Sequence, residues 1–79
     1  MVYLGNYQLT PELVLTVSRE GRKVFVQATG QSRIEAFAES SNKFFFKTIQ
    51  ASMEFVKDQN GLIKEMIFIQ GRTIHAKRL

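Results

Sequence analysis

Apolar and polar residues alternate with a period of two along much of the chain. The stretches LVLTVS (13–18), VFVQAT (24–29) and ASMEFV (51–56) each place apolar side chains at every second position. Successive side chains of a β-strand point to opposite faces, so this alternation is typical of strands with one buried face. β-branched and aromatic residues are frequent in these stretches and favour the same conformation.

Turn-forming residues interrupt the alternation every 8 to 12 residues or so, as in an antiparallel meander. Asn60-Gly61 is the strongest turn signal, because both residues tolerate a positive φ. The remaining signals are Glu20-Gly21, Thr29-Gly30-Gln31, Ser40-Ser41-Asn42, Ile49-Gln50 and Gln70-Gly71. The strands predicted between them span about 5–10, 13–19, 22–29, 33–39, 43–48, 51–58, 62–70 and 73–79.

No segment carries a helical pattern of apolar residues, so the fold class predicted is all-β. An open sheet of eight short strands would expose two edges, and closure into an antiparallel up-and-down barrel removes them. A barrel of this size has an interior that side chains can just fill. The residues expected to fill it are Leu13, Leu15, Val17, Val24, Val26, Phe44, Phe46, Met53, Phe55, Met66, Phe68 and Ile74.

One predicted strand breaks the alternation. In the stretch 62–70, Ile63 has the opposite parity to Met66 and Phe68, although all three are apolar. A β-bulge near Lys64-Glu65 would shift the phase by one residue and turn all three inward. The alternative is that Ile67 and Ile69 face a partner, and both can hold together.

Length and composition indicate one small domain of ordinary globular character. The chain has 79 residues, no cysteine and a formal net charge of +4. It has no apolar run of the roughly 18 residues that a membrane helix needs, and its first ten residues do not read as a signal peptide. We therefore expect neither membrane insertion nor a cysteine-based metal site. The eleven lysines and arginines are scattered, which favours solvated strand faces over a nucleic-acid footprint.

The stretch Ser40-Ser41-Asn42-Lys43 fits the S-x-x-K nucleophile motif of penicillin-recognising enzymes. In those enzymes the motif opens a helix, which brings the lysine amine beside the serine hydroxyl. Here three phenylalanines follow, which predict a strand, and no S-D-N or K-T-G partner is present. We therefore interpret the four residues as a hairpin and expect no catalytic residue in the chain.

Several apolar residues have the wrong parity for the core. Phe25, Phe45, Ile67 and Ile69 would point outward, and we predict that they form an interface. A nucleic-acid reading of the segment K-F-F-F-K, with bases stacked on its rings, is less favoured because the glycines of an RNA-binding motif are missing. The lone His75 has no second ligand or catalytic partner in the pattern, so no metal or cofactor site is expected.

The stretches YLGNYQL, LTVSREGRKVFVQATGQ, ESSNKFFFKT, MEFVKDQNGLIKEMIF and HAKRL carry a resemblance to a known family. In this order they resemble the lipocalin-like C-terminal domain of unknown function appended to β-lactamase-related serine hydrolases and peptidases. The resemblance implies that residues 1–79 are a single barrel domain from the C-terminus of a longer hydrolase. It also implies that the S-x-x-K chemistry belongs upstream, in a periplasmic or extracellular enzyme.

Three functions follow as expectations. The favoured one is a non-catalytic accessory module that contacts its hydrolase domain or a second copy of itself. The alternatives are a carrier of small hydrophobic ligands, which would need an empty interior, and a nucleic-acid-binding barrel, which would need a continuous basic face. Resemblance to lipocalin-like barrels further predicts closure through Gly5, Tyr7 and Arg78, with the Arg78 guanidinium over the Tyr7 ring.

Overall fold

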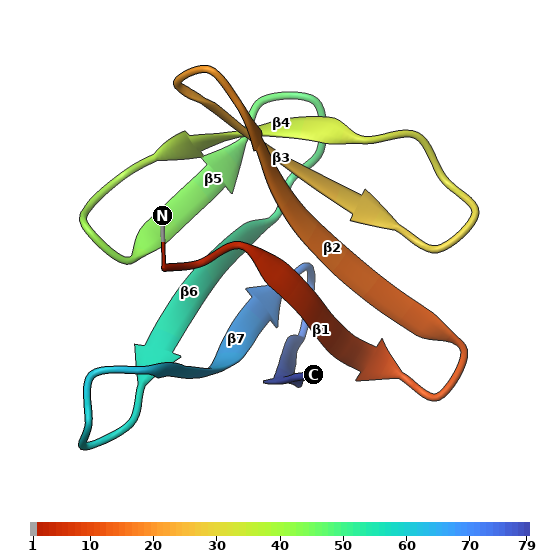
Figure 1. Cartoon of the computed structure of the whole chain (residues 1–79). Coiled ribbons are helices and arrows are strands. Elements are labelled where there is room, and N and C mark those ends of the chain that lie inside the picture. The colour runs from red at the N-terminus through yellow and green to blue at the C-terminus, as the bar shows by residue number, and fades with distance from the viewer. Residues whose placement is uncertain (1) are drawn as a thin grey trace.

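A computed structural model describes residues 2–79 and shows eight β-strands (Figure 1). No helix occurs among these residues, so they contain no helix that could cross a membrane. The strands are β1 (Gly5–Thr10), β2 (Leu13–Glu20), β3 (Lys23–Ala28), β4 (Ile34–Ala38), β5 (Lys43–Phe46), β6 (Ser52–Lys57), β7 (Ile63–Ile69) and β8 (Thr73–Arg78).

Each strand pairs antiparallel with its neighbour in sequence, and β8 returns to pair with β1, so the sheet is a closed barrel. The predicted fold class, strand number and up-and-down order are therefore confirmed. The largest boundary difference concerns β5, which ends at Phe46 because residues 47–50 form the following turn. Closure leaves no strand edge free to pair with another chain.

The up-and-down order gives the barrel two different ends. The loops β1–β2, β3–β4, β5–β6 and β7–β8 lie at one end, which we name the open end. The loops β2–β3, β4–β5 and β6–β7 lie at the other, the closed end, together with the start of β1 and the end of β8. In Figure 1 the β3–β4 loop is on the right, whereas the β4–β5 loop is on the left.

The predicted bulge is present in β7. Val56 is opposite Glu65 and Lys57 is opposite Ile63, so Lys64 is the extra residue. Beyond the bulge the alternation resumes with its phase shifted. Ile63 is consequently buried together with Met66 and Phe68.

The barrel interior is apolar. Every core residue expected from the alternation is buried except Leu13 and Ile74, which are only partly covered. Both lie where their strands begin at the open end, and the interior is less filled there. Tyr7, Ala36, Ile63 and Ala76 complete the buried set.

Candidate functional site

A tyrosine plugs the closed end of the barrel. The Tyr3 ring stacks on Phe55, with centroids 4.5 Å apart and planes inclined by 19°, and meets Phe44 edge-on at 5.8 Å. Its hydroxyl donates to the Ser41 carbonyl, and its own carbonyl accepts a 2.7 Å hydrogen bond from the Tyr7 hydroxyl. The sequence prediction began its first strand at residue 5 and missed this plug. Its one signal was that Tyr3 has the same parity as Tyr7.

The three residues expected to close the barrel lie together beside this plug. Tyr7 is opposite Arg78 in the β1–β8 pairing. The Arg78 guanidinium donates to the Leu4 carbonyl at 2.8 Å and lies against Gly5, where a Cβ atom would come within 3.4 Å of Nε. Gly5 has a φ of +145°, which residues with a side chain rarely adopt. Glycine therefore suits both the backbone and the neighbouring arginine.

The expected stacking of Arg78 on Tyr7 is not what the structure shows. The cation–π contacts of the described residues join Arg33 to Phe25 and Lys47 to Phe37. Arg78 instead uses its donors on backbone carbonyls, because the carbonyl of Leu4 lies within hydrogen-bonding distance. Burial raises the pKa of the Tyr7 hydroxyl, and the nearby Arg78 charge lowers it in part.

Phe25, one of the four outward apolar residues, lies apart from the others and is covered. Arg33 sits 3.9 Å above the centre of its ring and is paired with Glu20 at 2.6 Å. The hydrogen bond from Arg33, and then its charge, hold the pKa of Glu20 below its ordinary value. Glu35 lies directly opposite Phe25 on the neighbouring strand. The carboxylates of Glu20 and Glu35 thus share this surface with Arg33, so the surface around Phe25 is not uniformly basic.

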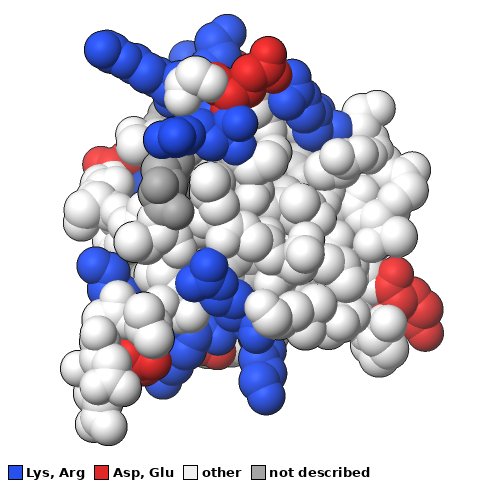
Figure 2. Space-filling view, in the orientation of Figure 1, with Lys and Arg blue, Asp and Glu red and all other residues white. Residues whose placement is uncertain are grey.

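Figure 2 shows a similar mixture of charges on the face in view. Lysines and arginines gather at the upper and lower edges, and acidic side chains lie beside them at both. A basic side chain of the lower group reaches toward the middle of this face, and an uncharged area separates it from the upper group. A phosphate backbone tracking across this face would meet no continuous basic strip.

Phe45, Ile67 and Ile69 lie together on the outer side of β5, β6 and β7. Phe45 is opposite Ser52, which is opposite Ile69, so the two apolar side chains flank a small residue. Phe45 is 36% exposed and Ile69 41%, whereas Ile67 is half-buried one row away. We name the surface formed by Phe45, Ser52, Ile67 and Ile69 the β5–β7 face.

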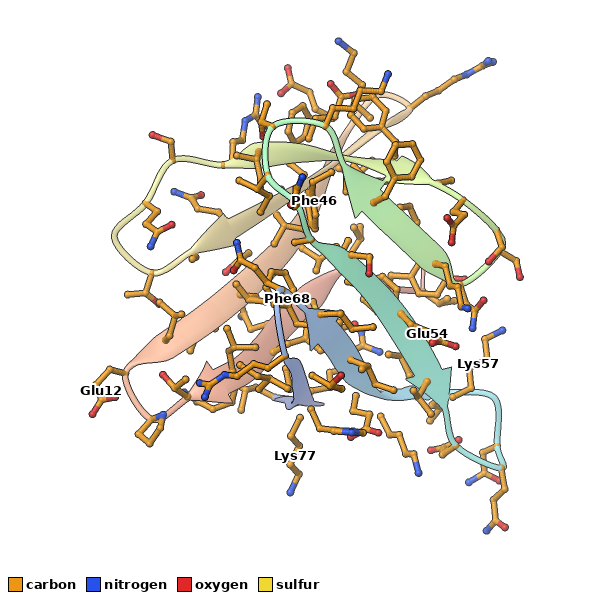
Figure 3. The ribbon with its side chains drawn as sticks, turned by 180° about the vertical axis from the view of Figure 1, so that it is seen from behind. Glu12, Phe46, Glu54, Lys57, Phe68 and Lys77 are labelled. Atoms are coloured by element: carbon orange, nitrogen blue, oxygen red, sulfur yellow. The ribbon has the colours of Figure 1, made fainter. Side chains whose placement is uncertain are left out.

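The β5–β7 face has an aromatic flank and a polar margin. Phe37 on β4 contacts Phe45 with ring centroids 5.8 Å apart, and the Lys47 ammonium lies 4.2 Å from the centre of the Phe37 ring. A depression of about 90 Å³ runs beside Ser52 and Ile69 and is bordered by Glu54 and Lys43. Figure 3 shows Glu54 projecting from β6 beside this strand's outer surface. Phe37 was not singled out in the sequence, although it has the outward parity of Glu35.

The open end of the barrel holds a cavity of about 230 Å³, which we name the mouth. Buried side chains form its walls, and partly exposed ones form its rim. The lining residues are Leu9, Leu13, Leu15, Val26, Ala28, Gln31, Ser32, Ile34, Phe46, Ile49, Phe68 and Gln70. The interior is thus filled along the middle and the closed end, and hollow at the open end.

The remaining polar candidates occupy loops and outer faces. Ser40 and Asn42 lie in the β4–β5 loop with their side chains 3.2 Å apart, and Lys43 begins β5. The S-x-x-K stretch is therefore a hairpin and not the start of a helix. His75 is exposed and lies 3.2 Å from Glu65. Within residues 2–79, no three histidine, aspartate or glutamate side chains form a group that could hold a metal ion.

The sequence of this barrel matches a known protein family. Residues 2–78 match the family described as Domain of unknown function (DUF3471). The chain belongs to this family. It is also 25% identical to Penicillin-binding protein 4* of Bacillus subtilis (strain 168) over 76 residues. That match covers 96% of the chain but only 17% of the relative. No solved structure matches the chain, so the lipocalin-like part of the expectation stays a prediction.

Proposed function

We propose that this DUF3471 barrel is a non-catalytic accessory domain of a β-lactamase-related serine hydrolase, and that it docks on the catalytic domain of its own polypeptide. The observation that carries the proposal is the exposed apolar β5–β7 face. Phe45 and Ile69 would be covered by a partner there, and solvent-exposed apolar groups of this kind gathered on one surface are typical of contact sites.

The position of the N-terminal segment supports this choice of partner. Tyr3 is held against the β4–β5 loop by its bond to Ser41 and against β6 by its stacking on Phe55. Figure 1 shows the segment that precedes β1 passing beside β5 and β6, in agreement with the ring contacts of Tyr3. A catalytic domain joined at this point would begin beside the closed-end parts of β5 and β6, and it would have to extend along these strands to cover Phe45 and Ile69 nearer the open end.

The relative supplies the second support. Most of the length of Penicillin-binding protein 4* lies outside the matched region, and its name describes a protein that binds penicillin. A catalytic domain in the corresponding part of this polypeptide would supply the serine nucleophile. Ser40 and Lys43 do not form one, because they belong to a hairpin. By the same analogy we propose that the complete protein acts outside the cytoplasm.

The composition of the face fits an intramolecular contact better than a tight complex between separate chains. Its apolar core is small, and Glu54 and Lys43 border it. Contacts between domains of one chain are commonly small and polar, because the linker already holds the partners close.

The experiment starts from the coding sequence upstream of Met1, where we expect an in-frame serine hydrolase domain. In that longer protein, Phe45→Ser with Ile69→Ser should raise amide hydrogen exchange on β5–β7 and on the catalytic surface that they cover. Leu62→Ser is the matched control, because Leu62 is an apolar residue, 64% exposed, in the β6–β7 loop. It should leave the exchange unchanged.

Two results would overturn the proposal. One is the absence of a hydrolase from the same polypeptide. The other is a double variant that leaves exchange at the contact unchanged and shifts only the monomer–dimer equilibrium, which would assign the face to a second copy of the chain.

A further inference from the structure

The mouth at the open end is separate from the docking face and has its own chemistry. Nine of its twelve lining residues are apolar, and the other three are the neutral Gln31, Ser32 and Gln70. Buried Phe46 and Phe68 lie at its inner wall with ring centroids 6.3 Å apart (Figure 3). Leu9, Ile34 and Ile49 line its rim and remain partly exposed to solvent.

We propose that the mouth binds a small, neutral, largely apolar molecule about the size of one substituted aromatic ring. The proposal does not depend on the docking of a hydrolase domain, because the mouth and the N-terminal segment lie at opposite ends of the barrel. A ligand there would complete the apolar interior that the side chains leave unfinished.

Volume sets the size of the ligand. A closed apolar cavity of about 150 Å³ takes up benzene, and pockets for drug-sized ligands start at about 300 Å³. The mouth, at about 230 Å³, falls between them. It therefore holds one ring with a short substituent and is too small for a long acyl chain.

The absence of charged residues from the lining restricts the chemical class of the ligand. No lysine, arginine, aspartate or glutamate lines the mouth. An ionised ligand would lose its hydration without gaining a partner, and this cost is large in apolar surroundings. A fatty-acid carboxylate or a phosphate is therefore a poor occupant.

The rim supplies a means of orienting a neutral ligand. The side-chain amides of Gln31 and Gln70 have no hydrogen-bond partner among the protein residues that the structure describes, and both line the mouth. An amide can donate and accept. A ligand with one hydroxyl or ring N–H would place that group at the rim and its ring against Phe46 and Phe68.

The test is a titration of the ¹⁵N,¹³C-labelled 79-residue chain with p-cresol and indole, followed by amide and methyl chemical shifts. We expect saturable shifts at Ile34, Ile49 and the β3–β4 loop. Benzoate, which has a similar size and a charge, should shift these resonances only at concentrations about tenfold higher or more, because it must be desolvated. Dodecanoate should not reach saturation at the mouth.

Two variants separate occupation of the mouth from a general effect on the fold. Ala28→Leu adds bulk inside the cavity and should weaken p-cresol binding by about tenfold or more, since a filled site must expand to admit the ring. Thr16→Leu places the same leucine side chain on the exposed outer side of β2 and should leave binding unchanged. Ile49→Ala enlarges the rim and should shift the preference from p-cresol toward the two-ring 2-naphthol.

The proposal is overturned if all probes leave the mouth resonances unmoved up to their solubility, or if benzoate binds as well as p-cresol. It is also overturned if the resonances of the mouth shift with protein concentration alone, because a second copy would then be the occupant. None of these results bears on the docking of the β5–β7 face.

Discussion

At the scale of single residues, parity along the strand decides the role of each phenylalanine. Phe44 and Phe46 point inward and are buried, and Phe45 between them is exposed. The sequence predicted this division because strand geometry alone determines it. It did not predict the contacts of Arg78, because the alternation says which face a side chain occupies and not which acceptor it reaches.

Phe55 is the residue whose loss should cost the barrel most. It is 1% exposed and contacts the rings of Tyr3, Tyr7 and Phe44. Phe55→Ala should lower the free energy of unfolding by about 3–5 kcal/mol, because it leaves a cavity at the closed end. Chemical denaturation measures the change, and Phe45→Ala is the control. Because Phe45 is exposed, its variant should lose about 1 kcal/mol or less. Equal losses would contradict the assignment of the two rings to different faces.

Tyr7 should make stability depend on pH above about 10, the ordinary pKa of tyrosine. Burial raises the pKa of Tyr7 in the folded protein, so the unfolded chain loses this proton first as pH rises. The contribution of Tyr7 to stability is therefore complete below that pH and declines as pH rises through the folded-state pKa. Denaturation of wild type and Tyr7→Phe at pH 8 and 11 tests this.

The variant should be less stable at pH 8, because the hydrogen bond to the Tyr3 carbonyl is lost, at a cost of about 0.5–1.5 kcal/mol. It should lose less of its remaining stability than wild type between the two pH values. A parallel decline in both proteins would show that Tyr7 is not the group responsible.

At the scale of elements, the bulge in β7 lets the strand bury apolar residues whose alternation differs by one position on its two sides. Ile63 and Met66 are both buried only because Lys64 is left out of the pairing. The sequence predicted this bulge because a regular strand would have turned one of the two outward. The Tyr3 plug was missed for a related reason: a residue outside any alternating run gives no periodic signal.

Deletion of Lys64 should be tolerated. It brings Ile63 and Met66 two positions apart, so both stay inward against β6 in a regular ladder. Some stability should be lost, because bulges increase the local twist that helps a sheet to close. Deletion of Ile67, which lies within the regular part of β7, is the control and should prevent folding by turning one end of the strand inside out. Thermal unfolding followed by circular dichroism distinguishes the two. Failure of both deletions would show that Lys64 has a role in the native pairing.

At the scale of the whole molecule, local alternation predicted the strand order and the closure, since every neighbour in an up-and-down barrel is also a neighbour in sequence. It did not predict the unequal ends. Whether an end is filled depends on residues outside the strands, such as Tyr3 at one end and Ile49 at the other. The mouth was missed because the volume of a core depends on how side chains meet in three dimensions.

The seam between β1 and β8 has a consequence for how the molecule opens. It has two registered residue pairs, Tyr7 with Arg78 and Gln8 with Lys77, against six between β2 and β3. Its partners are also the farthest apart along the chain, so separating them returns the most chain entropy. Local unfolding should therefore begin there, and amides of β8 should exchange with solvent before those of β2 and β3.

An opened seam turns the edgeless barrel into a sheet with two free edges, and β1 of one molecule could then pair with β8 of another. Arg78 opposes this by bonding the Leu4 carbonyl across the seam. Arg78→Ala should consequently speed exchange in β8 and increase the fraction of strand-swapped dimers after storage at high concentration, measured by size-exclusion chromatography. The side chain that closes the barrel would then also oppose the exchange of strands between molecules.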